Sequence, residues 1–169
     1  MNKEEIIQII RESICDLRLH DKLLLEANPK EDAINHRLAV YIECKIRKLN
    51  LLHSIDVEYD KFNLGQKLIY DEEGIAIKIR PDIIVHCRMS QDNNLLAIEA
   101  KKGNLIRKDR RTLRGLLGYP FNYRFACMVS YFPKKDFSAF EILFYNQNNE
   151  LIKEKVRVQP LYLQEYALE

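Results

Sequence analysis

The feature that most constrains the fold of this chain is a change in hydrophobic period near residue 50. Before it, apolar side chains recur every three or four positions, as on the buried face of a helix: Ile34, Leu38, Ile42, Ile46 and Leu49. After it, apolar and charged residues alternate from Ile55 to Asp60, which is typical of a half-buried strand. Because a one-sided helix and a one-sided sheet bury their apolar faces against each other, the sequence predicts helices packed on a sheet.

The remaining segments extend this pattern. Residues 3–26 have helical spacing, a basic helix is predicted near 104–117, and strands are predicted at 66–70, 77–89, 95–101, 125–132 and 140–146. A last strand near 155–163 is expected at a sheet edge because it contains Pro160. We expect one α/β domain over 1–169, with helices on a central mixed sheet in the order helix, three or more strands, helix, strands. Its parts are a helical extension (1–27), a core (28–146) and a C-terminal addition (147–169).

Composition narrows the class of protein. The chain has 169 residues, of which 47% are hydrophobic and 31% charged, which is typical of a soluble globular domain. Apolar runs are far shorter than the roughly 18 residues of a membrane span, and the first ten residues contain acids where a signal peptide has bases. We therefore expect a cytoplasmic protein without a membrane partner. The four cysteines and four histidines are scattered, so neither a disulfide partner nor a zinc site is expected.

Positive charge is concentrated in one segment. Between Lys101 and Arg114 there are seven bases and one acid, Asp109, a local charge of +6 in a chain whose net charge is +2. A basic stripe on a mildly acidic body is suited to binding phosphate groups. A solvated helix face explains the same pattern, and the stripe alone does not decide between the two.

Three charged residues interrupt the apolar strands near this stripe. Asp82 follows Pro81, and Glu99 and Lys101 lie two residues apart, so the last two share a face of their strand. If the two strands form an antiparallel pair, Asp82 joins that face only when an even-length turn or a bulge connects them. We predict that parity, for example a four-residue turn, and with it a cluster of two carboxylates and an ammonium group. An ordinary solvated hairpin is the alternative.

Such a cluster is suited to a hard divalent cation. The carboxylates of Asp82 and Glu99, with the backbone carbonyl of Ala100 between the strand's two charged residues, are oxygen ligands that Mg²⁺ or Mn²⁺ accepts. A bound cation lowers the pKa of a water molecule, and Lys101 can orient the water or stabilise negative charge. The chemistry implied is hydrolysis of a phosphodiester.

The segment "RPDIIVH…NNLLAIEAKKG" resembles the PD-(D/E)xK nuclease superfamily, which has the restriction-endonuclease-like fold. The match consists of Pro81-Asp82 and Glu99-Ala100-Lys101 and extends over roughly residues 28–146 by order of elements. It is similar to stand-alone members of the superfamily. The resemblance implies that residues 31–43 form the first core helix, which often brings a further acid to the metal.

Glu31 is the best candidate for that further acid, by its offset from His36-Arg37-Leu38-Ala39, with Asp32 and Glu26 as alternatives. A capping box is equally compatible with Glu31, because Asn28 can cap the helix and Glu31 lies three residues later. Both roles stay open at this point. His86 shares the face of Asp82 but is better explained as a hydrogen-bonded histidine at a sheet edge than as a substrate contact.

The sequence context of the other charged residues indicates whether each contacts nucleic acid, packs within the protein or lies on a helix surface. Candidates for contact with nucleic acid are Arg80, Lys102, Arg107, Lys108, Arg111 and Arg114, each of which is alternatively a solvated charge. His36 and Arg37 are assigned to packing and surface pairing. A second Glu-x-Lys, Glu43 to Lys45, is interpreted as helix surface because it follows a helical stripe.

Two functions follow. The first is a Mg²⁺-dependent nuclease, an expected endonuclease, with Asp82, Glu99, Lys101 and Glu31 in the site and DNA favoured over RNA as substrate. A homodimer is possible, since cutting both strands of a duplex commonly requires two sites. The alternative is a non-catalytic nucleic-acid-binding or assembly module on the same fold.

Overall fold

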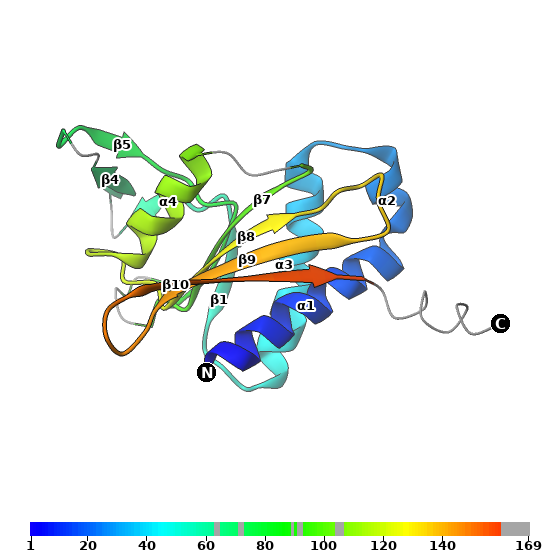
Figure 1. Ribbon diagram of the computed structural model, residues 1–169, viewed down its shortest axis with the longest axis horizontal. Helices are drawn as coiled ribbons and strands as arrows, with labels where there is room; N and C mark the ends of the chain where they lie inside the picture. The colour runs from blue at the N-terminus through cyan, green and yellow to red at the C-terminus, as the bar shows by residue number, and fades with distance from the viewer. Residues whose placement is uncertain (63–64, 71–72, 89, 91–92, 104–106, 160–169) are drawn as a thin grey trace.

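The computed structural model describes residues 1–62, 65–70, 73–88, 90, 93–103 and 107–159 (Figure 1). Its helices are α1 (Lys3–His20), α2 (Lys22–Ala27), α3 (Glu31–Lys48) and α4 (Arg107–Leu117). Its strands are β1 (Ser54–Val57), β2 (Lys61–Phe62), β3 (Gly65–Gln66), β4 (Leu68–Tyr70), β5 (Ala76–Lys78), β6 (Ile83–His86), β7 (Leu96–Lys101), β8 (Phe125–Ser130), β9 (Ser138–Tyr145) and β10 (Leu151–Val158).

A mixed sheet forms the centre of the molecule. Its six strands lie in the order β1-β6-β7-β8-β9-β10, while β2-β3 and β4-β5 form two small separate hairpins. Strands β7 and β8 are parallel and are connected through α4, and the other neighbours are antiparallel. The expected mixed α/β architecture is confirmed. The last strand does lie at the edge, but it begins at Leu151 rather than near 155, and Pro160 falls outside the described residues.

The N-terminal helices cover one face of the sheet (Figure 1). A capping box at Asn2 starts α1, because the Asn2 side chain accepts from the Glu5 N–H and the Glu5 carboxylate accepts from the Asn2 N–H. The apolar stripes of α1 and α3 then pack on the inward residues of the central strands, among them Ile83 and Ile98. Four residues of the predicted stripe, Ile34, Leu38, Ile42 and Ile46, therefore belong to the larger of the two cores, whereas Leu49 follows the end of α3 and is 50% exposed.

The opposite face of the sheet is covered by α4 and the β4-β5 hairpin. Leu113, Leu116 and Leu117 of α4 pack on sheet residues that include Ala97. Gly115 permits a close approach, since a Cβ at that position would lie 2.5 Å from Cγ2 of Ile69. This second face is also the face of Asp82, Glu99 and Lys101, so α4 and the charged residues share one side of the sheet.

Two predicted strands and one helix are divided in the structure. Residues 77–89 do not form one strand, because β5 pairs with β4 whereas β6 belongs to the central sheet. Pro81 lies between them and has no N–H for a ladder hydrogen bond. The strand starting near Ile55 ends at Val57, because Glu58 has a φ of 53°. The N-terminal helix ends at His20, and α2 follows after Asp21.

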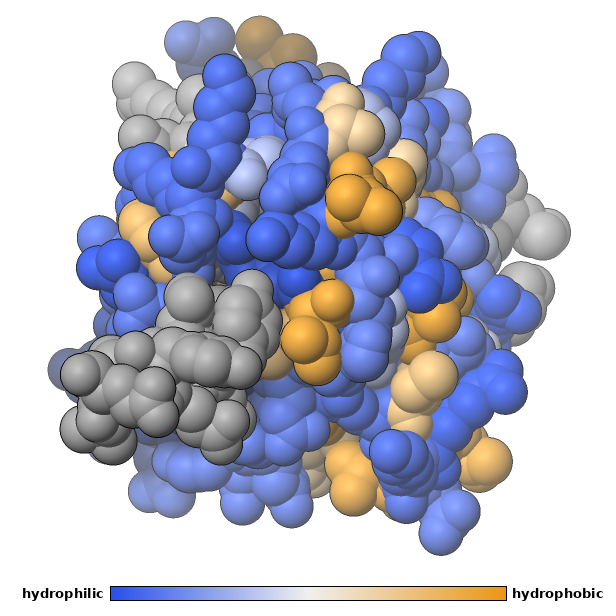
Figure 2. Space-filling view, turned by 90° about the vertical axis from the view of Figure 1, so that its right-hand side faces the viewer, coloured by the Kyte–Doolittle hydropathy of each residue, from blue (hydrophilic) through white to orange (hydrophobic). Residues whose placement is uncertain are grey.

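The surface seen from the side that carries α2 is mainly hydrophilic, and its apolar side chains form separate small groups (Figure 2). Among the described residues, none of the helices combines the length and the apolar composition that crossing a membrane requires.

Candidate functional site

The register of β6 and β7 brings the two acids of the predicted site together. Ile83 pairs with Ile98 and Val85 with Leu96, and the same register continued by one residue sets Asp82 opposite Glu99. Opposite residues share a face, so the predicted parity is confirmed. The connection is longer than a four-residue turn, since residues 86–95 lie between the last pair, but their number is even as parity requires. Oδ2 of Asp82 accepts a hydrogen bond of 2.7 Å from the Ala100 N–H.

Glu31 reaches the end of the same strand from the helical layer. It is the first residue of α3, and its Oε1 accepts a hydrogen bond of 3.0 Å from the Lys102 N–H, across 71 residues of sequence. Nζ of Lys102 donates in return to the Pro29 carbonyl at 2.7 Å. The start of α3 and the end of β7 are therefore joined by two hydrogen bonds.

The capping box proposed for Asn28 and Glu31 is wrong. Asn28 instead ends α2 in the left-handed conformation, with a φ of 51°. The residue before α3 is Lys30, whose side chain makes no capping hydrogen bond. The local pattern of Asn28 followed by Glu31 predicted a cap, but Glu31 instead binds the Lys102 N–H, which is distant in sequence.

Burial and mutual repulsion dominate the electrostatics of the acids. Burial, helped by the nearby charges of Asp82 and Asp109 and opposed by Lys101, raises the pKa of Glu99 to about 8. Burial, opposed by the hydrogen bond from the Ala100 N–H and helped by the charge of Glu31, raises the pKa of Asp82 to about 6. A carboxylate pair in this state gains stability from a proton or a cation.

Lys101 lies on the face of Glu99 and forms an ion pair with α4. Its Nζ is 3.1 Å from Oδ1 of Asp109, and the Asp109 side chain is only 7% exposed. In the sequence Asp109 is the single acid of a basic stripe, and it is not among the predicted site residues. Its spacing from Leu113 and Leu116 was the available signal, because residues four and seven positions apart share a helix face and both leucines are buried.

The predicted nucleic-acid contacts fall into two groups. Arg80 forms an ion pair with Glu58 at 3.0 Å, and Lys102 is bonded to Pro29, so each has a partner within the protein. The side chains of Lys108, Arg111 and Arg114 are exposed on α4. The side chain of Arg107 lies outside the described part of the chain.

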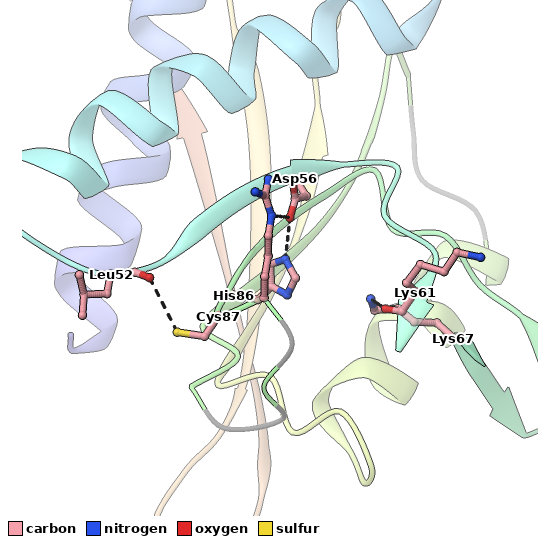
Figure 3. A network of polar contacts seen from close by, with 7 residues as sticks. Leu52, Asp56, Lys61, Lys67, His86 and Cys87 are labelled. Carbon is pink, nitrogen blue, oxygen red and sulfur yellow. Dashed lines mark hydrogen bonds and ion pairs between the residues drawn. The ribbon is translucent and has the colours of Figure 1, made fainter. Parts of the chain in front are cut away.

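His86 belongs to a network that satisfies it within the protein (Figure 3). Its Nε2 is 2.8 Å from Oδ2 of Asp56, and the same oxygen accepts from Nε of Arg88 at 2.9 Å. Burial lowers the pKa of His86, whereas hydrogen bonds from Arg88 and His86 lower the pKa of Asp56. His86 is thus a hydrogen-bonded structural histidine, although β6 is an inner strand rather than an edge.

The second Glu-x-Lys lies on α3, with Glu43 partly exposed and the Lys45 side chain only 14% exposed, so the expected surface position does not hold for Lys45. Glu43 pairs with Arg47 one helical turn away, and Lys45 pairs with Asp16 of α1. Arg37 pairs with Asp21 and donates to Tyr41, which confirms its assignment to surface pairing. The two copies of the motif therefore differ in context, since the first lies in strand β7 and the second on helix α3.

The carboxylates of Glu31, Asp82 and Glu99, which we call the acidic cluster, are oxygen donors of the kind that a divalent cation prefers. Three carboxylates reach one strand end from three elements, and two of them have raised pKa values that a cation would lower. Among the described residues, no group of three or more His, Cys, Asp or Glu side chains forms a ready-made metal site. Ligation by these acids and by the Ala100 carbonyl stays a prediction.

Comparison of the chain with protein-family models, with curated proteins and with solved structures finds no significant match.

Proposed function

We propose that this chain is a divalent-metal-dependent nuclease that hydrolyses phosphodiester bonds, with DNA as the expected substrate. The observation that carries the proposal is the pair formed by Asp82 and Glu99, two carboxylates opposite each other on one face of the sheet and largely shielded from water. Glu31 is hydrogen-bonded to the end of the same strand, and Lys101 shares the face. Clustered acids with strongly shifted pKa values are characteristic of functional sites.

The order of elements supports membership of the PD-(D/E)xK superfamily. Helix α3 is followed in the central sheet by the antiparallel strands β1, β6 and β7, then by α4, and then by β8 parallel to β7. This is the helix–three strands–helix–strand order that the resemblance implies for residues 28–146. The candidate acids lie at the start of the first helix, directly before the second strand and on the third strand.

Asp82, Glu99, Glu31 and the Ala100 carbonyl are the groups that would hold Mg²⁺ or Mn²⁺. Asp82 and Glu31 each use one carboxylate oxygen in a hydrogen bond to the backbone of β7 or the residue after it, and a carboxylate has a second oxygen for a ligand. When bound, the cation would supply an activated water and neutralise charge on the phosphate.

The chain's own residues supply positioning and charge. The ammonium group of Lys101 lies on the face of Glu99, where it stabilises negative charge that develops on the phosphate. The exposed bases of α4 attract the phosphate backbone without selecting a sequence. Arg80, Lys102 and Arg107 are proposed as further phosphate contacts, the first two through exchange of their partners within the protein.

The direct test is cleavage of plasmid, single-stranded DNA and RNA with Mg²⁺, Mn²⁺ or a chelator. We expect cleavage that needs the metal and falls at least about 100-fold in Lys101→Ala and Glu99→Gln. The matched control is Lys45→Ala, which removes the lysine of the second Glu-x-Lys on α3. Its cleavage rate per folded molecule should equal that of the unmodified chain.

Binding of nucleic acid without cleavage under every metal condition would instead support the non-catalytic module. Sedimentation of the active protein tests whether cutting of both duplex strands accompanies a homodimer.

A further inference from the structure

The two neighbouring lysines at the end of β7 have different partners. Lys102 points its ammonium group to the Pro29 carbonyl, on the side of the helical layer. Lys101 points to α4, where its Nζ is 3.1 Å from Oδ1 of Asp109. Alternation along the strand therefore sends one lysine to each face of the sheet, and each is fixed by a specific oxygen.

Asp109 is the buried partner in this contact. Its side chain is 7% exposed, whereas that of Lys101 is 29% exposed, so the acid is the buried and the lysine the more accessible partner. It lies in the first turn of α4, one turn before the buried Thr112 and Leu113. Packing of the helix on the sheet thus determines where the carboxylate of Asp109 lies.

Asp109 also affects the acidic cluster through space. Its charge is among the causes that raise the pKa of Glu99, so it lies close enough to interact with both Glu99 and Lys101. A lysine side chain has four rotatable bonds and adopts many rotamers when nothing holds it. An anchored carboxylate beside its ammonium group selects the rotamers that keep the charge near Glu99.

We propose that Asp109 is a positioning residue that holds the Lys101 ammonium group beside Glu99 for the reaction. This inference rests on the proposed nuclease function and adds a residue from α4 to a site otherwise built from α3, β6 and β7. Asp109 acts through Lys101 and takes no part in holding a metal.

The test is a double-mutant cycle in the cleavage assay, with Asp109→Asn, Lys101→Ala and the double variant. Asp109→Asn should lower kcat by about 10- to 100-fold and leave KM and the affinity for Mn²⁺ unchanged. In the Lys101→Ala background the same substitution should have no further effect on kcat, because its target is gone. Asp109→Glu, which keeps the carboxylate, should recover at least part of kcat.

The matched control is Asp16→Asn, which breaks the ion pair with Lys45 between α1 and α3, on the opposite face of the sheet. It should leave kcat unchanged. Equal losses of kcat from Asp109→Asn with and without Lys101 would overturn the proposal, as would a parallel loss of Mn²⁺ affinity.

A second cycle separates this inference from the proposed function. If Asp109 holds Lys101, their substitutions should be non-additive in urea unfolding, with a coupling of at least about twofold in the unfolding equilibrium constant. Absence of cleavage by the unmodified chain would refute the proposed function, and the unfolding cycle would still decide whether the two residues are coupled. Additive effects on unfolding would refute the positioning role.

Discussion

Asp82, directly before β6, and His86, at the end of β6, lie on the same face of the sheet but have neighbours of different charge. At one end, Asp82 lies among the like charges of Glu31 and Glu99, and its pKa is raised to about 6 by burial. At the other end, His86 binds Asp56, whose pKa is lowered by hydrogen bonds from Arg88 and His86. The first group is the acidic cluster (Glu31, Asp82, Glu99), and we call the second the paired network (Asp56, His86, Arg88).

The difference between the two groups is the one expected between charges that stabilise a fold and charges that bind a ligand. The paired network contains its own counter-charges, so it is complete within the protein and contributes to stability. Among the described residues, Lys101 and, less strongly, Lys108 are the lysines whose charge opposes the raised pKa of Glu99, and Lys101 is engaged by a further acid, Asp109. Buried acids in excess of nearby bases are costly to the fold, which is the pattern expected where a ligand provides the missing positive charge.

The largest expected contrast is in catalysis. Glu99→Gln should reduce metal-dependent cleavage by at least about 100-fold, because it removes a negative ligand from the acidic cluster. Asp56→Asn should leave the cleavage rate per folded molecule unchanged, because the paired network has no part in the reaction. Both rates are measured on a fluorescent duplex at saturating metal. Equal losses in the two variants would remove the distinction between the two groups.

The next contrast is in the response of stability to metal. At a Mn²⁺ concentration 100 times its Kd, the free energy of unfolding of the unmodified chain should rise by about 2.7 kcal/mol. Asp82→Asn should lose most of this gain, whereas Asp56→Asn should keep it. Calorimetric melting with and without the ion checks both variants. A gain of the same size in Asp82→Asn would show that the ion binds elsewhere.

A smaller effect concerns Lys67, a buried lysine near the paired network (Figure 3) whose Nζ donates to the Lys61 carbonyl. Burial lowers its pKa from 10.5 to about 8. At Lys67 the folded state therefore binds fewer protons than the unfolded state between these values, and the contribution of this residue to stability should rise with pH from about 8 to 10.5, by about 2 kcal/mol. Burial raises the pKa of Cys127 and of Tyr123, which lowers stability as pH rises, equally in the unmodified chain and in Lys67→Met. Urea unfolding should therefore show the contribution of Lys67 as the difference between these two proteins. An identical pH dependence in both would assign no such contribution to Lys67.

The smallest expected effect is the stability cost of Asp56→Asn. Asparagine keeps an acceptor oxygen for His86 but loses the charge that faces Arg88, which is itself an exposed partner. The free energy of unfolding should fall by about 1 kcal/mol in urea. The control is Asp60→Asn, four residues further along the chain and outside these hydrogen bonds. It should leave the free energy of unfolding unchanged. An unchanged stability in Asp56→Asn would mean that the paired network is not a source of stability.

Much of this arrangement could be predicted from the sequence because it depends on local periodicity. Alternation in residues 95–101 fixed the face shared by Glu99 and Lys101, and parity then restricted the register of Asp82. The helical stripe of residues 34–46 likewise identified the face of α3 that enters the core. In each case the spacing of side chains along one segment contains the information.

The errors arose where distant segments determine the outcome. Glu31 was equally compatible with a local cap, and only the docking of α3 against β7 brings it to the Lys102 N–H. Asp109 was counted with its basic neighbours, because its burial depends on which side of α4 meets the sheet. The strand predicted at 77–89 was divided because the alternation of apolar residues continues through Pro81 although the chain changes sheets there.

The two hydrogen bonds between residues 29–31 and Lys102 determine when the acidic cluster can form during synthesis of the chain. During synthesis, the helix that contains Glu31 is made before β7. The Glu31 carboxylate therefore cannot form its hydrogen bond to the Lys102 N–H until β7 and Lys102 have been synthesised. A chain that ends before Lys102 contains Glu31 but lacks the N–H group that binds its carboxylate. The acidic cluster therefore forms late, after α3 has packed against the sheet.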